Sequence, residues 1–440
     1  MSQSQRLEKS LSPDDPGWHA TVEFLNEHQQ ALALIREGAS LPGLGFEVGF
    51  PDDYTSQELH LFNMQADPDY LKAEQAKNFR DPDRALIGVL LPHLGPMRNL
   101  AKLLAADAER AAMVGDGDTA LADALAIQRI AQHANEHPLL IDGLVCLSIR
   151  KLGYRTVQRV LISHPDLWHD SQLRDLAHAI AAQNVSLEAW FNTERLWFYD
   201  FLQRTYTDDG AGGGQITKQG IEDLKTYGSP EDPFGLTPSS PLVIAGLPAA
   251  SVIVAPRGEM KRMYDNLMDQ ATLDGQKPLW QRGDSPDLDE RVEAIASSNF
   301  TRMRYLPIVL YMPALSSVSK TVEYDLGTRE GVMIGIALTL YRRQHGDWPA
   351  TLDVLAPTYL PTVPVDRLTG KALCYVVTDD GPVVYSVGVD GDDDGGRPPI
   401  DSKGDINNKN ASPYHWTPDL RAEREYDGDW VLWPVPEEKR

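Results

Sequence analysis

One long stretch with a helical period constrains the fold of this chain more than any other feature. Between Asp81 and about Arg204, apolar residues recur at steps of three and four, as in NLAKLLAADAERAAM and ALADALAIQRIAQHA. Such spacing places the apolar side chains on one face of each helix, and antiparallel helix pairs bury those faces. No clean period of about 34 residues recurs, which argues against a tetratricopeptide-type repeat. We therefore predict a mainly α protein with an irregular α-helical array over residues 81–204.

Changes in composition divide the rest of the chain. Residues 1–80 are mixed, and apart from a helical pattern around Trp18–Arg36 we expect an irregular lead-in. Residues 205–245 are rich in Gly, Pro and Ser, which is typical of a connector. Residues 246–320 return to a helical pattern, and residues 321–440 have a mixed one. The 440 residues are enough for two or three domains.

The charge of the chain restricts its partners. A formal net charge of −23 at pH 7 argues against nucleic acids and anionic membranes, because phosphate binding needs concentrated Lys and Arg. The N-terminus, MSQSQRLEKSLSPDDPGW, lacks the apolar core of a secretory signal peptide. The apolar stretch from Pro241 to Pro256 is too short for a bilayer span and is interrupted by Pro248, so we expect a buried hairpin or loop. Cys146 and Cys374 are far apart, which excludes a disulfide framework.

The last part of the chain has the pattern of a small α+β domain. Apolar residues on one face predict a long helix that stops at Gly346, and a short second helix follows, with Thr351 as its cap. Two strand-like runs, ALCYVVT and PVVYSVG, are joined by an Asp-Asp-Gly turn at Gly381, which is typical of a β-hairpin. Another strand-like run, DWVLWPV, comes near the end. We expect residues 321–440 to form this domain.

An acidic loop follows the predicted hairpin and has the chemistry of a calcium loop. Asp390, Asp392 and Asp394 stand at alternate positions before two glycines. Ca²⁺ takes about six to eight oxygen ligands, and alternate carboxylates can converge on it where a glycine turns the backbone. Asp401 and Asp405 are available to close the shell. The loop therefore predicts a bound Ca²⁺.

The order of these motifs resembles the C-terminal domain of the major pseudopilin of type II secretion systems. A long helix with Tyr and Gly-x-Trp-Pro is followed by a short helix, Pro-x-x-Pro-x-Asp with Thr-Gly-Lys, a hairpin, Tyr-Ser-x-Gly-x-Asp-Gly and Gly-Asp-Ile. The resemblance covers roughly residues 325–410, about a fifth of the chain. The matching residues are Tyr341, Gly346, Trp348, Pro349, Leu352, Leu355, Pro361, Pro364, Asp366, Thr369, Gly370, Tyr375, Tyr385, Ser386, Gly388, Asp390, Gly391, Gly404, Asp405 and Ile406.

This resemblance implies a bound ion and an assembly role. In that family the loop after the last hairpin binds calcium, and the ion orders the C-terminal subdomain so that subunits can assemble. Carried over by position, the candidate ligands are Asp390, Asp392, Asp394, Asp401, Asp405 and the carbonyl of Gly396. A pseudopilin also begins with a processed leader and a membrane-spanning helix, and nothing before Glu330 resembles either. We therefore do not expect a pilus subunit in the ordinary sense.

A loop in the predicted connector has the register of an EF-hand without its ligands. Asp209 takes the first position and Gly214 that of the turn glycine, but Gly220 stands where the bidentate acid belongs. Ala211 and Gly213 replace the second and third carboxylates. We interpret the segment as a calcium-type loop that has lost its ion, or as a chance turn.

Two histidine groups in the predicted array are candidates for chemistry. His133 and His137 lie four apart in HANEH, so both imidazoles could face one metal, although the order is not His-Glu-x-x-His and no third ligand is marked. His164, His169 and Asp170 could form a small polar site in SHPDLWHD. The simpler interpretations are a surface or helix-end pair for the first group and helix punctuation for the second.

Three hypotheses follow from these patterns. The leading one is a non-enzymatic bacterial cell-envelope protein with a calcium-stabilised pseudopilin-like domain, which acts through protein–protein contacts. Because such calcium sites fill at extracellular concentrations, we expect an extracytoplasmic or periplasmic location. The alternative is a hydrolase-like enzyme with its site around His133/His137 or His164/His169 and the calcium domain as an accessory. In the third, the acidic loop is only a solvated tail.

Overall fold

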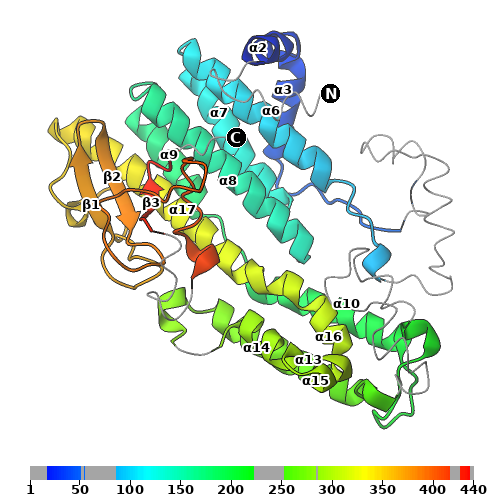
Figure 1. Ribbon diagram of the computed structural model, residues 1–440. Coiled ribbons are helices and arrows are strands. Elements are labelled where there is room, and N and C mark those ends of the chain that lie inside the picture. The colour runs from blue at the N-terminus through cyan, green and yellow to red at the C-terminus, as the bar shows by residue number, and fades with distance from the viewer. Residues whose placement is uncertain are drawn as a thin grey trace.

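A computed structural model of the chain describes residues 17–50, 54, 86–221, 252–283, 286–416 and 427–436. Helices make up most of this structure, and a small antiparallel sheet lies at one end (Figure 1). The arrangement confirms the predicted mainly α fold with a small α+β part near the C-terminus. Most of the predicted connector, and the apolar stretch up to residue 251, lie outside the described residues.

The predicted helical array forms a group of long helices. Its members are α6 (Leu94–Met113), α7 (Gly117–His133), α8 (Leu140–Ser163), α9 (Asp170–Ala181) and α10 (Leu187–Thr205), and the short η2 (Leu86–Gly88) precedes them. α6, α7 and α8 lie side by side (Figure 1). Buried alanines such as Ala105 and Ala124 bring these helices close together. α2 (Trp18–Glu27) and α3 (Gln29–Ala39) pack against this group, so the helix expected around Trp18–Arg36 is present but breaks at His28.

Capping interactions mark the start of α7, α9 and α10. Asp116 caps α7, and Ser186 caps α10. His169 caps α9 through a reciprocal capping box. Asp118 and Ser171 do not cap these helices, because each is already the second residue of its helix.

A second group of helices packs around α10. It comprises α13 (Arg257–Gly275), η3 (Leu279–Gln281), α14 (Leu288–Ala296), α15 (Asn299–Arg304) and α16 (Leu306–Tyr311). Phe198 of α10 and Tyr264 of α13 stack with their ring centroids 3.8 Å apart. Trp190 and Phe191 are also buried. The aromatic residues of α10 therefore contribute to a hydrophobic core.

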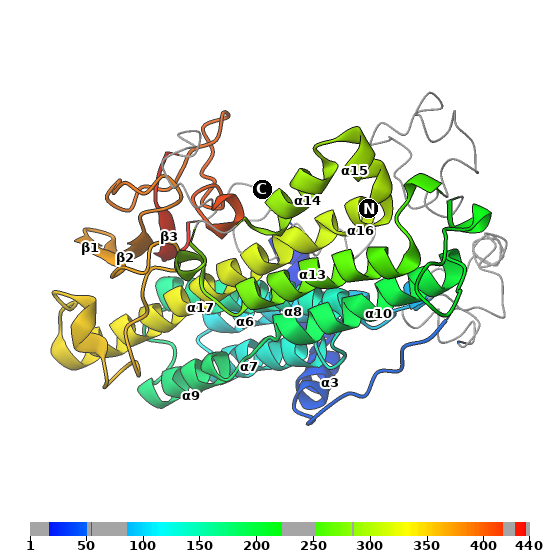
Figure 2. The same cartoon turned by 90° about the horizontal axis from the view of Figure 1, so that it is seen from below.

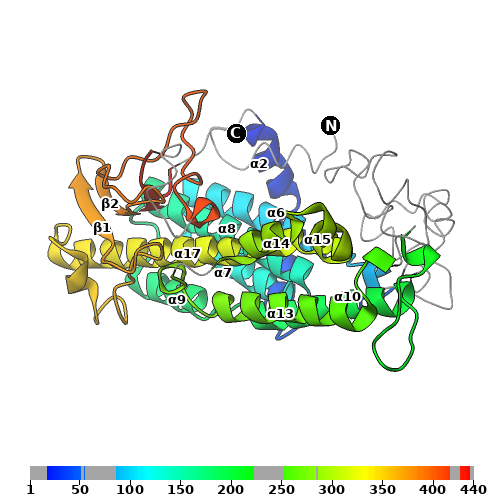
Figure 3. The same ribbon diagram turned by 60° about the horizontal axis from the view of Figure 1, so that its bottom comes forward.

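The longest described element, α17 (Pro313–His345), connects two hydrophobic cores. Val318 and Val322 belong to the core around α10 and α13, whereas Ile334 and Leu338 pack in the core of α8, α9 and the sheet. Figures 2 and 3 show this helix running along the molecule with the sheet beside its C-terminal half. The predicted boundary between residues 320 and 321 falls inside α17. One continuous helix thus supports both regions.

The sheet confirms the predicted hairpin. It consists of β1 (Cys374–Thr378), β2 (Gly381–Ser386) and β3 (Trp430–Trp433) in the order β1-β2-β3, with antiparallel pairing throughout. Thr378 pairs with Gly381, which leaves a two-residue turn between the first two strands. α17 ends at Gly346 as predicted, in a left-handed conformation with φ of 88°. The expected second helix is only a 3-10 turn, η4 (Leu352–Leu355), and Thr351 does not cap it with its side chain.

Three glycines at four-residue intervals let β3 lie directly on α17. Residues spaced by four share a face of a helix. A Cβ at Gly331 would overlap the carbonyl oxygen of Leu432, and Gly327 and Gly335 face the tryptophan rings of β3. The absence of side chains along this stripe therefore positions the strand.

Buried polar contacts fasten the array to the C-terminal region. Arg150 of α8 forms an ion pair with Asp325 of α17 at 2.8 Å, and both side chains are at most 4% exposed. The side-chain amide of Gln158 donates to the Val435 carbonyl at 2.7 Å and accepts from the Val435 amide at 2.8 Å. These contacts join α8 to both α17 and the end of β3.

Two sequence-based exclusions can be checked on the described residues. Cys146 is buried, Cys374 is half-buried, and both are free thiols. Among the helices that the structure describes, none combines the length and the apolar character that crossing a membrane requires.

Candidate functional site

The acidic loop brings the side chains of Asp390, Asp392 and Asp394 together, and we call these three residues the acidic cluster. Each offers a carboxylate oxygen that lies within 4.8 Å of the others. Gly391 and Gly395 adopt left-handed conformations, with φ of 76° and 70°. These turns allow alternate carboxylates to converge, as the sequence predicts.

Backbone amides near β3 hold this loop against the sheet. The Gly428 amide donates to Asp390 Oδ2 at 2.8 Å, and the Gly396 amide donates to Asp429 Oδ2 at 2.7 Å. Within the described structure, Asp390 Oδ1, Asp394 Oδ2 and Asp429 Oδ1 are buried and accept no hydrogen bond. Two oxygens of the acidic cluster, Asp390 Oδ1 and Asp394 Oδ2, are therefore available to a cation.

Asp393 takes a different direction from its neighbours. Its Oδ1 accepts hydrogen bonds from the Tyr385 hydroxyl at 2.9 Å and from the Gly395 amide at 2.9 Å. The loop thus turns this carboxylate toward β2 and leaves the alternate carboxylates for an ion.

Burial, together with crowded negative charge, raises the pKa values of Asp390 and Asp429. Burial and then the charges of Asp392 and Asp394 raise the pKa of Asp390. Burial, with help from nearby aspartates, raises the pKa of Asp429 to about 6. Arg397 contacts Asp394 Oδ1 and offsets part of this repulsion. A divalent cation would offset it more completely, because it places two positive charges among the oxygens.

The other predicted ligands lie outside the acidic cluster. Asp401 Oδ1 accepts hydrogen bonds from the Lys403 amide at 2.8 Å and the Asp405 amide at 3.0 Å, so this carboxylate closes its own turn. The Asp405 carbonyl in turn accepts from the Asp401 amide at 2.8 Å. Gly396, whose carbonyl was the predicted ligand, contacts Asp429 Oδ2 through its backbone amide. Among the described residues, the convergent carboxylates are those at positions 390, 392 and 394.

The EF-hand-like loop of the connector closes on its own backbone. Asp209 Oδ1 accepts hydrogen bonds from the Ala211 and Gly213 amides, both at 2.9 Å. An isolated bridge pairs Tyr206 with Ile216 at the base of the loop. Backbone amides therefore take the place of an ion around this aspartate.

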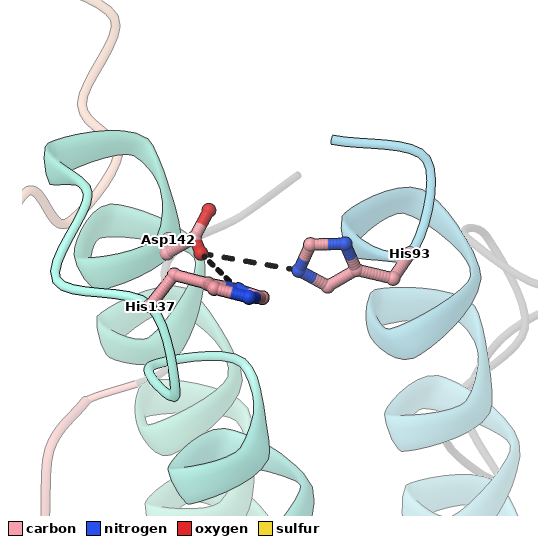
Figure 4. Close-up of side chains that lie close together, drawn as sticks. All are labelled: His93, His137 and Asp142. Atoms are coloured by element: carbon pink, nitrogen blue, oxygen red, sulfur yellow. Dashed lines mark ion pairs between the residues drawn. The ribbon is translucent and has the colours of Figure 1, made fainter. Parts of the chain in front are cut away.

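The histidines of HANEH point in different directions. α7 ends at His133, so the spacing of four no longer places both rings on one helical face. His133 Nδ1 lies 2.6 Å from Glu136 Oε1, and its Nε2 lies 3.2 Å from the Ala39 carbonyl. His137 instead faces Asp142 (Figure 4). The geometry therefore does not place His133 and His137 on one metal, which was the alternative to a helix-end pair.

His137 belongs to a group that sequence reasoning missed. His93, His137 and Asp142 offer ligand atoms within 4.8 Å of one another, and we call these residues the histidine cluster. Burial and then the nearby His137 lower the pKa of His93 to about 4, and burial raises the pKa of Asp142 to about 7. His93 precedes α6 and Asp142 lies in the first turn of α8. No local motif connects them, since only the packing of α6 beside α8 brings them together.

The second predicted polar site holds α17 in place. Arg343 of α17 donates to the Trp168 carbonyl at 2.7 Å and to Asp170 Oδ1 at 3.0 Å, and it also contacts the Pro165 carbonyl. His169 caps α9. The segment from His164 to Asp170 thus serves as a docking loop between the array and α17.

Comparisons with protein-family models, with curated proteins and with solved structures give no match for this chain. Its function is therefore argued from the clusters and surfaces that the structure shows.

Proposed function

We propose that this chain is a non-enzymatic protein of the bacterial cell envelope whose pseudopilin-like C-terminal part is stabilised by Ca²⁺ and which acts through protein–protein contacts. The observation that carries the proposal is the convergence of Asp390, Asp392 and Asp394 beside β3. Oxygen-rich, anionic sites of this kind suit Ca²⁺. Two of their oxygens, Asp390 Oδ1 and Asp394 Oδ2, are buried and accept no hydrogen bond from the described residues.

A cation at the acidic cluster would stabilise the C-terminal sheet. The loop is tied to β3 through Asp390 and Gly428, and through Gly396 and Asp429. An ion held by the cluster would reduce the repulsion among its carboxylates, which opposes these hydrogen bonds. The assembly role comes from the resemblance to pseudopilins, and the extracytoplasmic location from the calcium concentration that such sites need.

Calcium titration tests this proposal. Calorimetry on the chelator-treated protein is expected to show binding, and Ca²⁺ is expected to raise the melting temperature, since an ion that binds only the folded state stabilises it. Replacing Asp392 and Asp394 together by Ala removes both effects. Replacing Asp379 and Asp380 by Ala is the control, because it removes the same charge from the exposed hairpin turn. Absence of heat and of stabilisation in the unmodified protein would falsify the calcium proposal.

A second candidate function, the binding of a small anionic ligand, is favoured by a groove between α6 and α8. The groove has a volume of about 310 Å³. The cations that line it are Arg98, Lys102, Lys151, Arg155 and Arg159. In a chain with a net charge of −23, this local concentration of positive charge is unexpected. Such a groove attracts anions, and the net negative charge of the rest of the chain directs them to this face.

Inorganic pyrophosphate is a suitable probe for this groove. It should raise the melting temperature at low ionic strength, and the effect should weaken with salt because the contacts are ionic. Replacing Arg98 and Arg155 by Ala should remove the effect. The matched control replaces Arg129 and Arg174, two exposed arginines of the array. Equal stabilisation of both double variants by pyrophosphate would contradict a site in the groove.

A further inference from the structure

The histidine cluster has a geometry that the proposed calcium function does not use. His137 lies in the turn between α7 and α8, where its ring is directed toward Asp142, and His93 faces the same carboxylate from the start of α6 (Figure 4). His137 Nδ1 lies 3.4 Å from Asp142 Oδ2, and His93 Nε2 lies 3.9 Å from the same oxygen. Three elements that are separate in the sequence thus direct nitrogen and oxygen atoms at one point.

These separations suit metal ligands better than hydrogen-bond partners. A hydrogen bond would bring nitrogen and oxygen to about 2.7–3.2 Å. Ligands about 2.0–2.1 Å from a tetrahedral ion are instead roughly 3.4 Å from one another. Within the described structure, both ring nitrogens of His93, Nδ1 of His137 and both oxygens of Asp142 are buried and take part in no hydrogen bond. The atoms are therefore close together and unsatisfied.

Burial makes this lack of partners costly. The side chains of His93 and Asp142 are 1% and 0% exposed. A buried carboxylate normally has a charged or hydrogen-bonding partner. Elsewhere in the array, Asp107 and Asp123 follow this rule, because Arg36 contacts both. Within the described residues, the ion-pair contacts of Asp142 are with two imidazoles, which are the usual protein ligands of zinc-like ions.

The surroundings keep His93 in position. The Phe46 ring stacks on the imidazole, with centroids 4.5 Å apart and an angle of 13° between the planes. Glu136 fixes the segment before Phe46, because its carboxylate accepts hydrogen bonds from the Leu44 amide at 2.8 Å and the Gly45 amide at 2.9 Å. His137 is 28% exposed and so provides access from solvent. The site thus has an ordered wall and an entrance.

We infer that His93, His137 and Asp142 bind one first-row divalent ion of the zinc type. The donor set of two imidazoles and one carboxylate is harder than the thiolate sets of structural zinc sites. Three protein ligands leave one position of a tetrahedral ion for water or for an added ligand. This site is independent of the acidic cluster, which offers only oxygen donors and suits Ca²⁺.

Cobalt and zinc titrations of the tag-free, full-length protein test this inference. The chelator-treated chain should bind one Co²⁺ with visible absorption bands of a four- or five-coordinate ion, and Zn²⁺ should displace it. His93→Ala and Asp142→Asn should each weaken Zn²⁺ binding about 100-fold or more, because each removes one of three ligands. His178→Ala is the control, since His178 is an exposed histidine of the same array.

The Asp142→Asn variant distinguishes ligation from simple misfolding. It keeps the shape of the side chain, so its circular dichroism and its Ca²⁺ response should match those of the unmodified protein. If the cluster is only an ion pair between imidazolium and carboxylate, the unmodified protein will show no Co²⁺ bands and no stabilisation by Zn²⁺. Binding that persists unchanged in both His93→Ala and Asp142→Asn would also overturn the inference.

Discussion

The acidic cluster and the histidine cluster show two ways in which this chain gathers potential metal ligands. Asp390, Asp392 and Asp394 come from five consecutive residues of one loop, and glycine turns bring them together. The histidine cluster takes His93 and Asp142 from two helices and His137 from a turn. The first depends on local backbone geometry and the second on helix packing.

This difference determines what each cluster needs from the rest of the molecule. The acidic loop is tied to β3, and β3 lies on the glycine stripe of α17. The histidine cluster depends instead on the packing of α6, α7 and α8. Changes to the contact between α17 and β3 should therefore affect calcium binding more than zinc binding. The predictions below test this separation.

We expect the largest loss of stability at the contact between the helical array and the C-terminal region. Arg150→Met leaves Asp325 buried without its 2.8 Å ion-pair partner. Breaking a buried pair in this way costs about 3–5 kcal/mol of stability. Urea unfolding followed by circular dichroism measures the loss. If the array and the C-terminal region unfold together, the variant will show one transition at lower urea.

The double variant Arg150→Met with Asp325→Leu controls for lost packing. Removing both charges eliminates the unpaired carboxylate, so most of the stability should return. A double variant as unstable as the single one would show that the ion pair itself matters less than the shape of the arginine side chain.

Gly331→Val should have the next largest effect and should separate the two clusters. The added side chain would overlap the Leu432 carbonyl, and we expect a loss of about 2–3 kcal/mol as β3 moves away from α17. Hydrogen bonds hold the acidic loop to Gly428 and Asp429, which directly precede β3. Ca²⁺ affinity should therefore fall, while Zn²⁺ affinity should be unchanged. Calorimetry with each ion measures both.

Gly95→Ala is the matched control for this glycine. Gly95 lies near the start of α6, and a Cβ there meets nothing within 4 Å. Alanine in a helix should leave stability unchanged or raise it slightly. Equal losses of Ca²⁺ and Zn²⁺ affinity in Gly331→Val would contradict the proposed separation, because they would indicate general unfolding.

The same contrast explains which parts of the molecule could be predicted from the sequence. The hairpin and the end of α17 at Gly346 depend on residues close together in the chain, and their predictions are confirmed. The convergence of Asp390 with Asp392 and Asp394 also follows from alternate spacing and glycine turns. Asp401 stays apart because it satisfies its oxygen with amides of its own turn.

The histidine cluster could not be predicted, because its spacing has no local period. The pattern HANEH suggested a pair on one helical face, but α7 ends at His133 and the following turn redirects His137. Nothing around His93 marks it as a ligand until α6 packs beside α8.

The last prediction concerns a buried carboxylate of the array that already has a cationic partner. Asp123 is fully buried, and Arg36 Nε donates to it at 2.6 Å. Burial is the main cause that raises the pKa of Asp123 to about 8, and the Asp107 carboxylate adds to the effect. This arrangement contrasts with Asp142, whose ion-pair contacts in the described structure are with imidazoles.

The raised pKa of Asp123 predicts a pH-dependent stability. The unfolded chain releases this proton near pH 4, whereas the folded protein keeps it until about pH 8, so stability falls as pH rises between these values. Asp123→Asn cannot release a proton. It should match the unmodified protein near pH 4 and be the more stable of the two at pH 8, as measured by urea unfolding. Asp175→Asn, at an exposed position of α9, should follow the unmodified protein at every pH. Parallel curves for Asp123→Asn and the unmodified protein would show that Arg36 keeps the carboxylate ionised, and Zn²⁺ binding should be unchanged in either case because Asp123 lies outside the histidine cluster.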